Sequence, residues 1–430
     1  MQLVFVIIAV SGGAYFMFAK RRFDFLSIGY ISALVYFIPG FTGEVIYPME
    51  HSYVVGVPVS IHPETYLVMC MVLAGIGIAG LAYDLGQIPG GPAWNVQNEP
   101  AIATYATLYT YLGMFMTWVV VGMEILTSPD KNLILEEFTR WSILWSTGST
   151  LAFVLAMEQR RYWLASIACI PLMVEIYSGF RGATALAAIA AMTLWLNRQS
   201  DCRDVITHWK SIVAGCGAAV FLFVYKLLFS TVKAGDWALV LDLLGDPEVY
   251  YAALFSSEPF LTQSILNEVV REDFQVGLGH FASLVFSFIL FAPELGLEIT
   301  GFNDRVQSQL FPNMVESGIA ANIWAEVYSA GGWWLLIPFI VLYAFSLAAG
   351  SYAIRFSSPV VRGFLATGFC YLAFLMHRND LLFQITIEKR IVLFFALCWF
   401  SAKIGWRLSL PPLPLPLPLV RPIKPVTKAG

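Results

Sequence analysis

Four arginines stand apart from the other basic residues of this chain. They lie at the ends of apolar stretches or in the long polar interval between two of them, and they are Arg181, Arg271, Arg305 and Arg378. The first sits in Ser178-Gly-Phe-Arg-Gly182, where the glycines permit close approach and a following helix begins with its N–H groups free. Guanidinium groups bind phosphate oxygens in pairs of hydrogen bonds. The four arginines therefore predict an anion site that suits a phosphate.

Three of these four arginines also have a structural interpretation. Arg181 can be a side chain that fixes the depth of a helix by reaching toward water. Arg378 can belong to an ordinary charged turn, His377-Arg-Asn-Asp380. Arg271 precedes Glu272 and Asp273, so local ion pairs account for it equally well. The sequence leaves both interpretations open.

Proton transfer has three candidates, which are His280, Glu316 and Glu326. A carboxylate or an imidazole beside a hydroxyl can act as a general base, although each of these residues is also common in structural roles. We predict Glu326 or His280 as the base, and Arg271, Asp380 and Glu316 as secondary contacts to the ligand. The sequence contains no phosphate-binding loop, zinc-protease helix, nucleophile elbow or dinucleotide fingerprint. We therefore expect neither a metal nor a cofactor.

The composition indicates a membrane protein. Of the 430 residues 58% are hydrophobic and 13% are charged, about half the charged fraction of soluble domains. The net charge of −4 is small, and no basic face suited to nucleic acid is present. The six cysteines form no CxxC pair, and five of them fall in apolar stretches, so we interpret them as packing residues.

The predicted fold class is an all-α polytopic membrane protein with about eleven transmembrane helices. A helix needs roughly 20 apolar residues to cross the hydrocarbon, and such spans occur at 1–19, 23–39, 63–83, 101–126, 139–157, 162–178, 181–197, 211–229, 332–350, 361–377 and 386–402. This count divides the chain into helices 1–8 (1–229), a long loop (230–331), helices 9–11 (332–402) and a proline-rich tail (403–430).

The basic residues predict the orientation of these spans. Fifteen of the 25 lysines and arginines follow odd-numbered spans or lie in the tail, and such residues accumulate on the cytoplasmic side. The N-terminus is then outside, on a retained first helix, and the tail is cytoplasmic. The long loop lies outside, and we expect it to be partly helical and folded over a cavity. Its apolar run from Phe281 to Phe291 is too short to span and predicts a buried or interfacial helix.

The order of several short motifs resembles the Wzy-type O-antigen polymerases, which polymerise oligosaccharide repeat units of bacterial surface polysaccharides. The matching pieces cover about residues 175–385. They are Ser178-Gly-Phe-Arg-Gly182, Gly277-Leu-Gly-His280 before an apolar run and Pro293, the stretch from Ser317 to Gly332 that opens a span, and Arg378-Asn-Asp380. The resemblance implies a glycosyltransferase of the GT-C type in the bacterial inner membrane, acting at its periplasmic face.

The resemblance also implies the substrates. Two undecaprenyl-diphosphate-linked glycans would react, and the growing chain would move to the non-reducing end of a new repeat unit. Arg181, Arg305 and Arg378 would hold the diphosphate and stabilise the charge of the departing group without a metal. The expected partners are these lipid-linked glycans, membrane lipids and a polysaccharide chain-length regulator, with no nucleic acid.

Other classes of protein compete with this interpretation. An O-antigen ligase would share the chemistry and transfer the glycan to lipid A core. A transporter of lipid-linked oligosaccharides would be equally apolar, but its cavity charges would be spread over many helices. A membrane O-acyltransferase would need a histidine deep in a helix, and only His377 comes close to that.

Overall fold

The structure, a computed structural model, is predominantly helical. It describes residues 1–49, 52–86, 99–128, 131–199, 213, 217, 224–225, 228–250, 257–289, 295–296, 299–314 and 320–404. Within these residues the strands form one two-stranded sheet and nearly everything else is helix or turn. The expectation of an all-α class is therefore confirmed for the described part. Glu316, most of the expected span at 211–229 and nearly all of the tail lie outside it.

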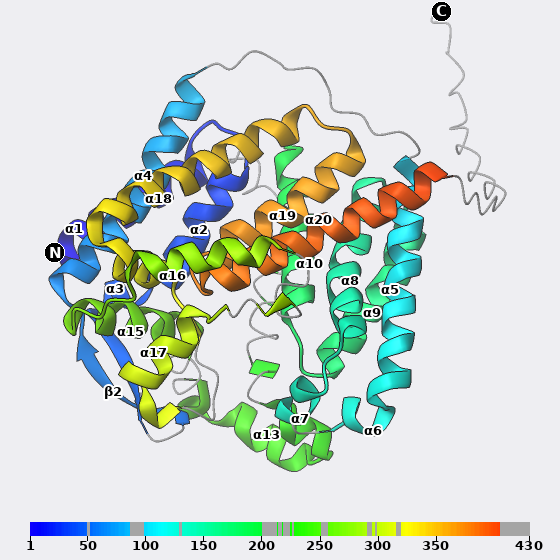
Figure 1. The fold of residues 1–430 in the computed structure, drawn as a ribbon, viewed down its shortest axis with the longest axis horizontal. Coiled ribbons are helices and arrows are strands. Elements are labelled where there is room, and N and C mark those ends of the chain that lie inside the picture. The colour runs from blue at the N-terminus through cyan, green and yellow to red at the C-terminus, as the bar shows by residue number, and fades with distance from the viewer. Residues whose placement is uncertain are drawn as a thin grey trace, which may run out of the picture.

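The longer helices form two groups (Figure 1). The first group contains α1 (Gln2–Phe18), α2 (Phe25–Tyr36), α4 (Pro63–Leu85) and α18 (Ile323–Arg355). The second contains α5 (Glu99–Val121), α8 (Arg140–Glu158), α9 (Tyr162–Tyr177), α10 (Gly182–Asn197) and α20 (Leu381–Ile404). Between them, α19 (Pro359–Leu375) packs against α2 and α18 as well as α8, α10 and α20. The turn that ends α19 is therefore placed where both groups can reach it.

Local chemistry fixes where several helices begin. The Asp24 side chain accepts a hydrogen bond from the Ser27 N–H and caps α2, and Asn322 caps α18 by accepting from the Trp324 and Ala325 N–H groups. Proline occupies the first turn of α4, α15 (Glu258–Arg271) and α19, where its missing N–H has no cost. The starts of α2, α4 and α19 fall within two residues of the limits that the hydropathy pattern predicts.

Two helices, Pro63–Leu85 and Ile323–Arg355, are long and apolar enough to cross a membrane. Shorter apolar helices of 10–17 residues accompany them in the described part of the chain, at Gln2–Phe18, Phe25–Tyr36, Tyr162–Tyr177, Gly182–Asn197, Gly277–Phe288 and Pro359–Leu375.

The expected loop at 40–62 contains a β-hairpin that the sequence analysis missed. Strands β1 (Glu44–Met49) and β2 (Ser52–Ser60) pair antiparallel, with Val45 opposite Val59. Helix α15 packs against β1, and the Tyr47 hydroxyl donates to the carbonyl of Leu310 over 2.8 Å. Alternating β-branched residues favour strand over helix here. The hairpin supports the helices of the long polar interval.

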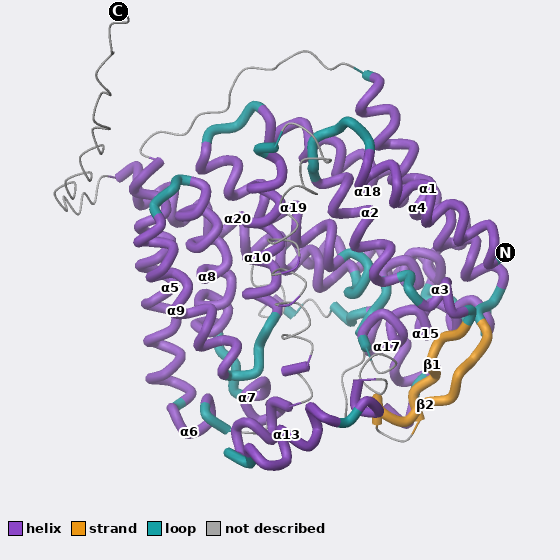
Figure 2. The backbone as a smooth tube through the Cα atoms, turned by 180° about the vertical axis from the view of Figure 1, so that it is seen from behind, coloured by secondary structure: helices purple, strands orange, loops and turns teal. Residues whose placement is uncertain are grey.

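The long polar interval folds as short helices, of which α13, α15 and α17 lie on the same side of the structure as the β-hairpin (Figure 2). They are α13 (Trp237–Gly245), α15 (Glu258–Arg271), α16 (Gly277–Leu284), the 3₁₀ turn η1 (Val285–Phe288), α17 (Phe302–Leu310) and the 3₁₀ turn η3 (Pro312–Met314). Three further short helices connect longer elements elsewhere, namely α3 (Pro39–Thr42), α6 (Met123–Leu126) and α7 (Lys131–Glu136). The helix expected from Phe281 to Phe291 begins earlier, at Gly277, and tightens to 3₁₀ geometry after Leu284.

Helix α18 begins at Ile323, well before the span expected from residue 332. Its path bends at Gly331 and at Gly332, whose φ of 57° and ψ of −149° are non-helical. Backbone of this kind is essentially confined to glycine. The bend separates a short first segment, which carries Glu326, from the long apolar segment that follows. Glu326 therefore belongs to the helix and is fixed by it.

Candidate functional site

The turn at residues 376–380, which joins α19 to α20, is the meeting point of the candidate residues. Its His377 is fully buried, and the indole Nε1–H of Trp324 donates to His377 Nδ1 over 3.1 Å. The imidazole also lies against the rings of Tyr36, Phe37 and Tyr343. His377 thus anchors the turn to α2 and α18, which explains a histidine at this depth without any catalytic role.

The structure brings Arg378 and Arg181 into one cluster with Glu258. The Arg378 guanidinium lies 3.0 Å from Glu258 Oε1, and these two side chains are 34% and 28% exposed. Arg181, which precedes α10, lies within electrostatic reach of both. An arginine remains charged in proteins, so the cluster combines two guanidiniums with one carboxylate.

His280 and Glu326, both predicted for proton transfer, form a buried pair. His280 Nε2 lies 2.8 Å from Glu326 Oε1, and neither side chain is exposed. The second oxygen, Glu326 Oε2, accepts the backbone N–H of Leu381 over 2.6 Å. His280 Nδ1 has no hydrogen-bond partner among the described residues. A carboxylate that holds Nε2–H leaves Nδ1 as the basic nitrogen of a neutral imidazole.

Asp380 joins two helix starts to the turn. It accepts a hydrogen bond from the Phe383 N–H at the start of α20 over 2.8 Å, and backbone N–H groups of Phe302 and Asn303 at the start of α17 also point to it. Burial raises the pKa of Asp380, and these N–H groups oppose the rise because they stabilise the charged form. Asp380 is therefore a helix cap in the structure, and through it the helix that carries Arg305 is fixed beside the turn.

The two remaining arginines differ in their surroundings. Arg271 pairs with Glu268 over 2.6 Å and with Glu272 over 3.1 Å, so its local ion pairs account for it as the structural interpretation expects. Arg305 is half-buried on α17, and no carboxylate of the described residues lies within ion-pair distance of it. Among the described residues, Arg305 is linked to the cluster through Asp380. Asp380 lies in the same turn as Arg378 and accepts backbone N–H groups at the start of α17.

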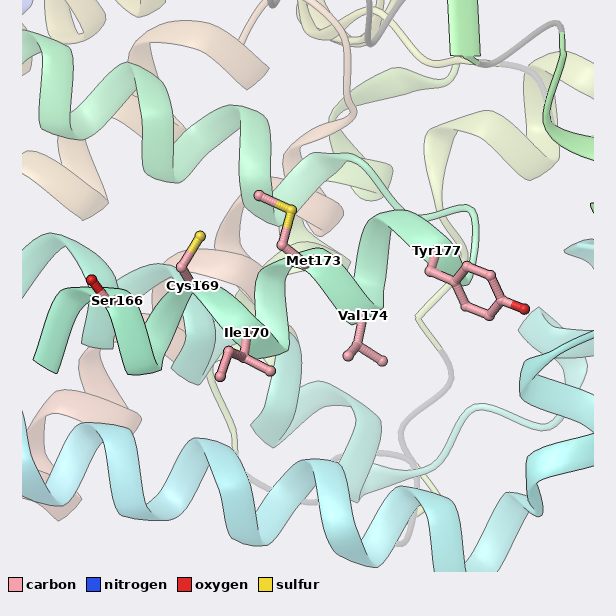
Figure 3. Close-up of a pocket in the computed structure, with 6 residues that line it drawn as sticks. All are labelled: Ser166, Cys169, Ile170, Met173, Val174 and Tyr177. Carbon is pink, nitrogen blue, oxygen red and sulfur yellow. The ribbon is translucent and has the colours of Figure 1, made fainter. Parts of the chain in front are cut away.

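Two open apolar pockets lie on the surface of the helices near these residues. One, of about 390 Å³, follows one face of α9 and ends at Tyr177, four residues before Arg181 (Figure 3). The other, of about 520 Å³, lies between α18, α19 and α20 and includes Met376 and Leu381 on either side of the turn. Both present hydrocarbon surface beside a charged turn, an arrangement that suits an amphiphile with an anionic head.

Sequence analysis did not identify Glu258 or Trp324 as members of this site. Glu258 sits in Ser257-Glu-Pro259, a normal helix start, and acidic residues are favoured there whatever their function. Trp324 is one of 13 tryptophans in an apolar chain. Neither residue carries a local signal, because their roles arise from contacts with the turn at 376–380.

Comparisons with known proteins identify no relative of this chain. A scan against models of protein families, a search of curated proteins and a search of solved structures each find no match to this chain.

Proposed function

We propose that this protein is a multi-pass inner-membrane polymerase of lipid-linked oligosaccharide repeat units. It transfers the growing glycan from undecaprenyl diphosphate to the non-reducing end of a new lipid-linked unit at the periplasmic face. The observation that carries the proposal is the convergence of Arg181 and Arg378, far apart in sequence, at one end of a bundle of apolar helices. Two guanidiniums at the border of hydrocarbon suit a lipid diphosphate better than a soluble anion.

In this mechanism Arg181 and Arg378 bind the diphosphate and stabilise the negative charge that develops as the glycan leaves. We propose Arg305, on α17, as the third residue that binds the diphosphate. Two positive charges already fixed at the leaving group serve the purpose that a divalent metal serves elsewhere, so we expect turnover in the presence of a chelator.

His280 serves as the general base, and Glu326 orients it. The hydroxyl of the acceptor sugar loses its proton to His280 Nδ1 as the new glycosidic bond forms. Both side chains of the pair are fully buried. The proposed mechanism therefore requires α16 to move when the acceptor binds. Three residues of α16 are exposed, namely Leu278, Gly279 and Ala282, with Leu278 at 65%, and only a short helix has to shift.

The proposed topology places eleven helices in a GT-C-type arrangement, with an N-terminus outside and a C-terminus in the cytoplasm. Two features support it. Two described helices are both long and apolar enough to span, and six shorter described helices are apolar. The candidate residues also gather at a single end of the bundle, as a site at one membrane face requires.

The experiment is a reconstitution with purified full-length protein and lipid-diphosphate-linked repeat units, without nucleotide sugar and with a chelator of divalent metals. We expect a ladder of lipid-linked products on a gel. Transfer that appears only after addition of lipid A core would replace the polymerase with a ligase. Movement of intact units across a vesicle membrane without any new linkage would indicate a transporter instead.

A further inference from the structure

Glu258 lies where a ligand of the two arginines is expected. Its Oε1 contacts the Arg378 guanidinium over 3.0 Å, and its charge acts on Arg181 as well. Carboxylate and phosphate oxygens accept the same hydrogen bonds from a guanidinium fork. The side chain is 28% exposed, so it can leave this position without unfolding its surroundings.

We propose that Glu258 occupies the phosphate position of Arg181 and Arg378 in the ligand-free protein, and that a lipid diphosphate displaces it on binding. This inference rests on the proposed function and adds to it a residue that sets how tightly the anion is held.

The structure restricts the movement to the side chain. Residues Phe260 to Val270 of α15 are buried, and the Asn322 side chain donates to the carbonyl of Thr262 over 2.9 Å. The backbone of the first turn is therefore held between α18 and the rest of the interval. Rotation of the Glu258 side chain toward solvent is sufficient to break its contact with Arg378.

Displacement has a consequence for turnover. A diphosphate beside an unmoved carboxylate would meet like charge, which weakens binding in close contacts. Competition from Glu258 thus lowers the affinity for both the lipid diphosphate of the donor and the lipid diphosphate that remains after transfer. A product that keeps the whole binding group of the substrate needs such a competitor in order to leave.

The test compares Glu258→Gln with the unchanged protein, both full length and in lipid nanodiscs. The probe is undecaprenyl diphosphate, with inorganic pyrophosphate as a competitor that lacks the lipid. We expect Glu258→Gln to lower the Kd for undecaprenyl diphosphate about tenfold, which corresponds to about 1.4 kcal/mol. We also expect multiple turnover to slow more than single-turnover transfer, because release of the product becomes limiting.

The matched control is Glu272→Gln, which removes the same charge from an exposed position at the other end of α15, beside Arg271. The Kd of Glu272→Gln for undecaprenyl diphosphate should equal that of the unchanged protein. An unchanged or higher Kd in Glu258→Gln would overturn the inference, as would loss of single-turnover transfer at normal affinity, which would make Glu258 the base. A tenfold effect on Kd in a protein that forms no ladder would reject the polymerase and leave the role of Glu258 standing.

Discussion

His280 Nε2 lies 2.8 Å from Glu326 Oε1, and this contact closes α16 over α18 with neither side chain exposed. The same glutamate accepts the Leu381 N–H through its other oxygen, so one carboxylate satisfies two donors. Glu326→Gln would turn an amide N–H₂ toward one of them. If the amide faces the imidazole, Nε2 has to accept its hydrogen bond. The imidazole then carries its proton on Nδ1, the nitrogen proposed as the base.

We therefore expect both Glu326→Gln and His280→Gln to lower kcat by about 100-fold or more, the usual range for loss of a general base. KM should change little, because neither residue is proposed to hold the diphosphate. Thermal unfolding measured in parallel separates chemistry from folding. Wild-type kcat in His280→Gln would remove the base assignment and leave the pair as a structural link.

The arginine cluster gives a prediction with an internal control. Arg378→Ala and Arg181→Ala should each reduce polymerisation by about 100-fold or more, because each removes a charged donor from the leaving group. Arg271→Ala removes an arginine that is already paired with Glu268 and Glu272, and it should leave chain lengths unchanged. Gel analysis of the lipid-linked products, at matched protein abundance, measures all three. Long chains from Arg181→Ala would contradict the site.

Sequence and structure agree where a residue's role is local and differ where it depends on distant contacts. The hydropathy pattern predicted α8, α9 and α10 within a residue or two of their limits, because an apolar run of helical length has few alternatives. The long interval was harder, since its helices are short and are defined by packing on the hairpin. Arg181 and Arg378 could be singled out as charges in apolar surroundings. Glu258 could not, because only the fold places it between them.

Asp380 gives the chain a specific dependence of stability on pH. Burial raises its pKa in the folded state above the ordinary value of 3.8, so the folded protein holds this proton more tightly than the unfolded chain does. The contribution of the Asp380 carboxyl group to the free energy of unfolding is fully present below pH 3.8. It is lost as the pH rises through the raised pKa of the folded state. The difference in unfolding free energy between the unchanged protein and Asp380→Asn should therefore fall as the pH is raised from about 4 toward 7.

Thermal unfolding of both proteins in one detergent across that range measures the effect. Glu272→Gln provides the comparison, because its exposed carboxylate is not buried at a helix start. A pH-independent difference between the unchanged protein and Asp380→Asn would show that Asp380 keeps an ordinary pKa in the folded state.

The hydrogen bond from Trp324 to His377 predicts a smaller, purely structural effect. Trp324→Phe keeps an aromatic ring among Phe339, Tyr343 and His377 but removes the donor to Nδ1. Loss of one buried hydrogen bond with an acceptor left unpaired costs about 1–3 kcal/mol. We expect a lower unfolding temperature together with looser placement of Arg378, seen as weaker binding of undecaprenyl diphosphate. Unchanged binding of undecaprenyl diphosphate by Trp324→Phe would mean that the turn at 376–380 is held in place without this hydrogen bond.

The bend in α18 rests on Gly332, and a single methyl group tests it. At φ 57° and ψ −149° an added Cβ meets no atom within 4 Å, so Gly332→Ala suffers backbone strain but no clash, and we expect about 1–3 kcal/mol of destabilisation. Gly77 lies inside α4 with equally open space around it, and alanine there should stabilise by up to about 1 kcal/mol, since helix interiors prefer it. Unfolding temperatures of the two variants should therefore move in opposite directions.

Because the bend sets the angle of the segment that carries Glu326, Gly332→Ala should also lower kcat more than its loss of stability explains. A straightened α18 with normal kcat would show that the position of Glu326 does not depend on the bend.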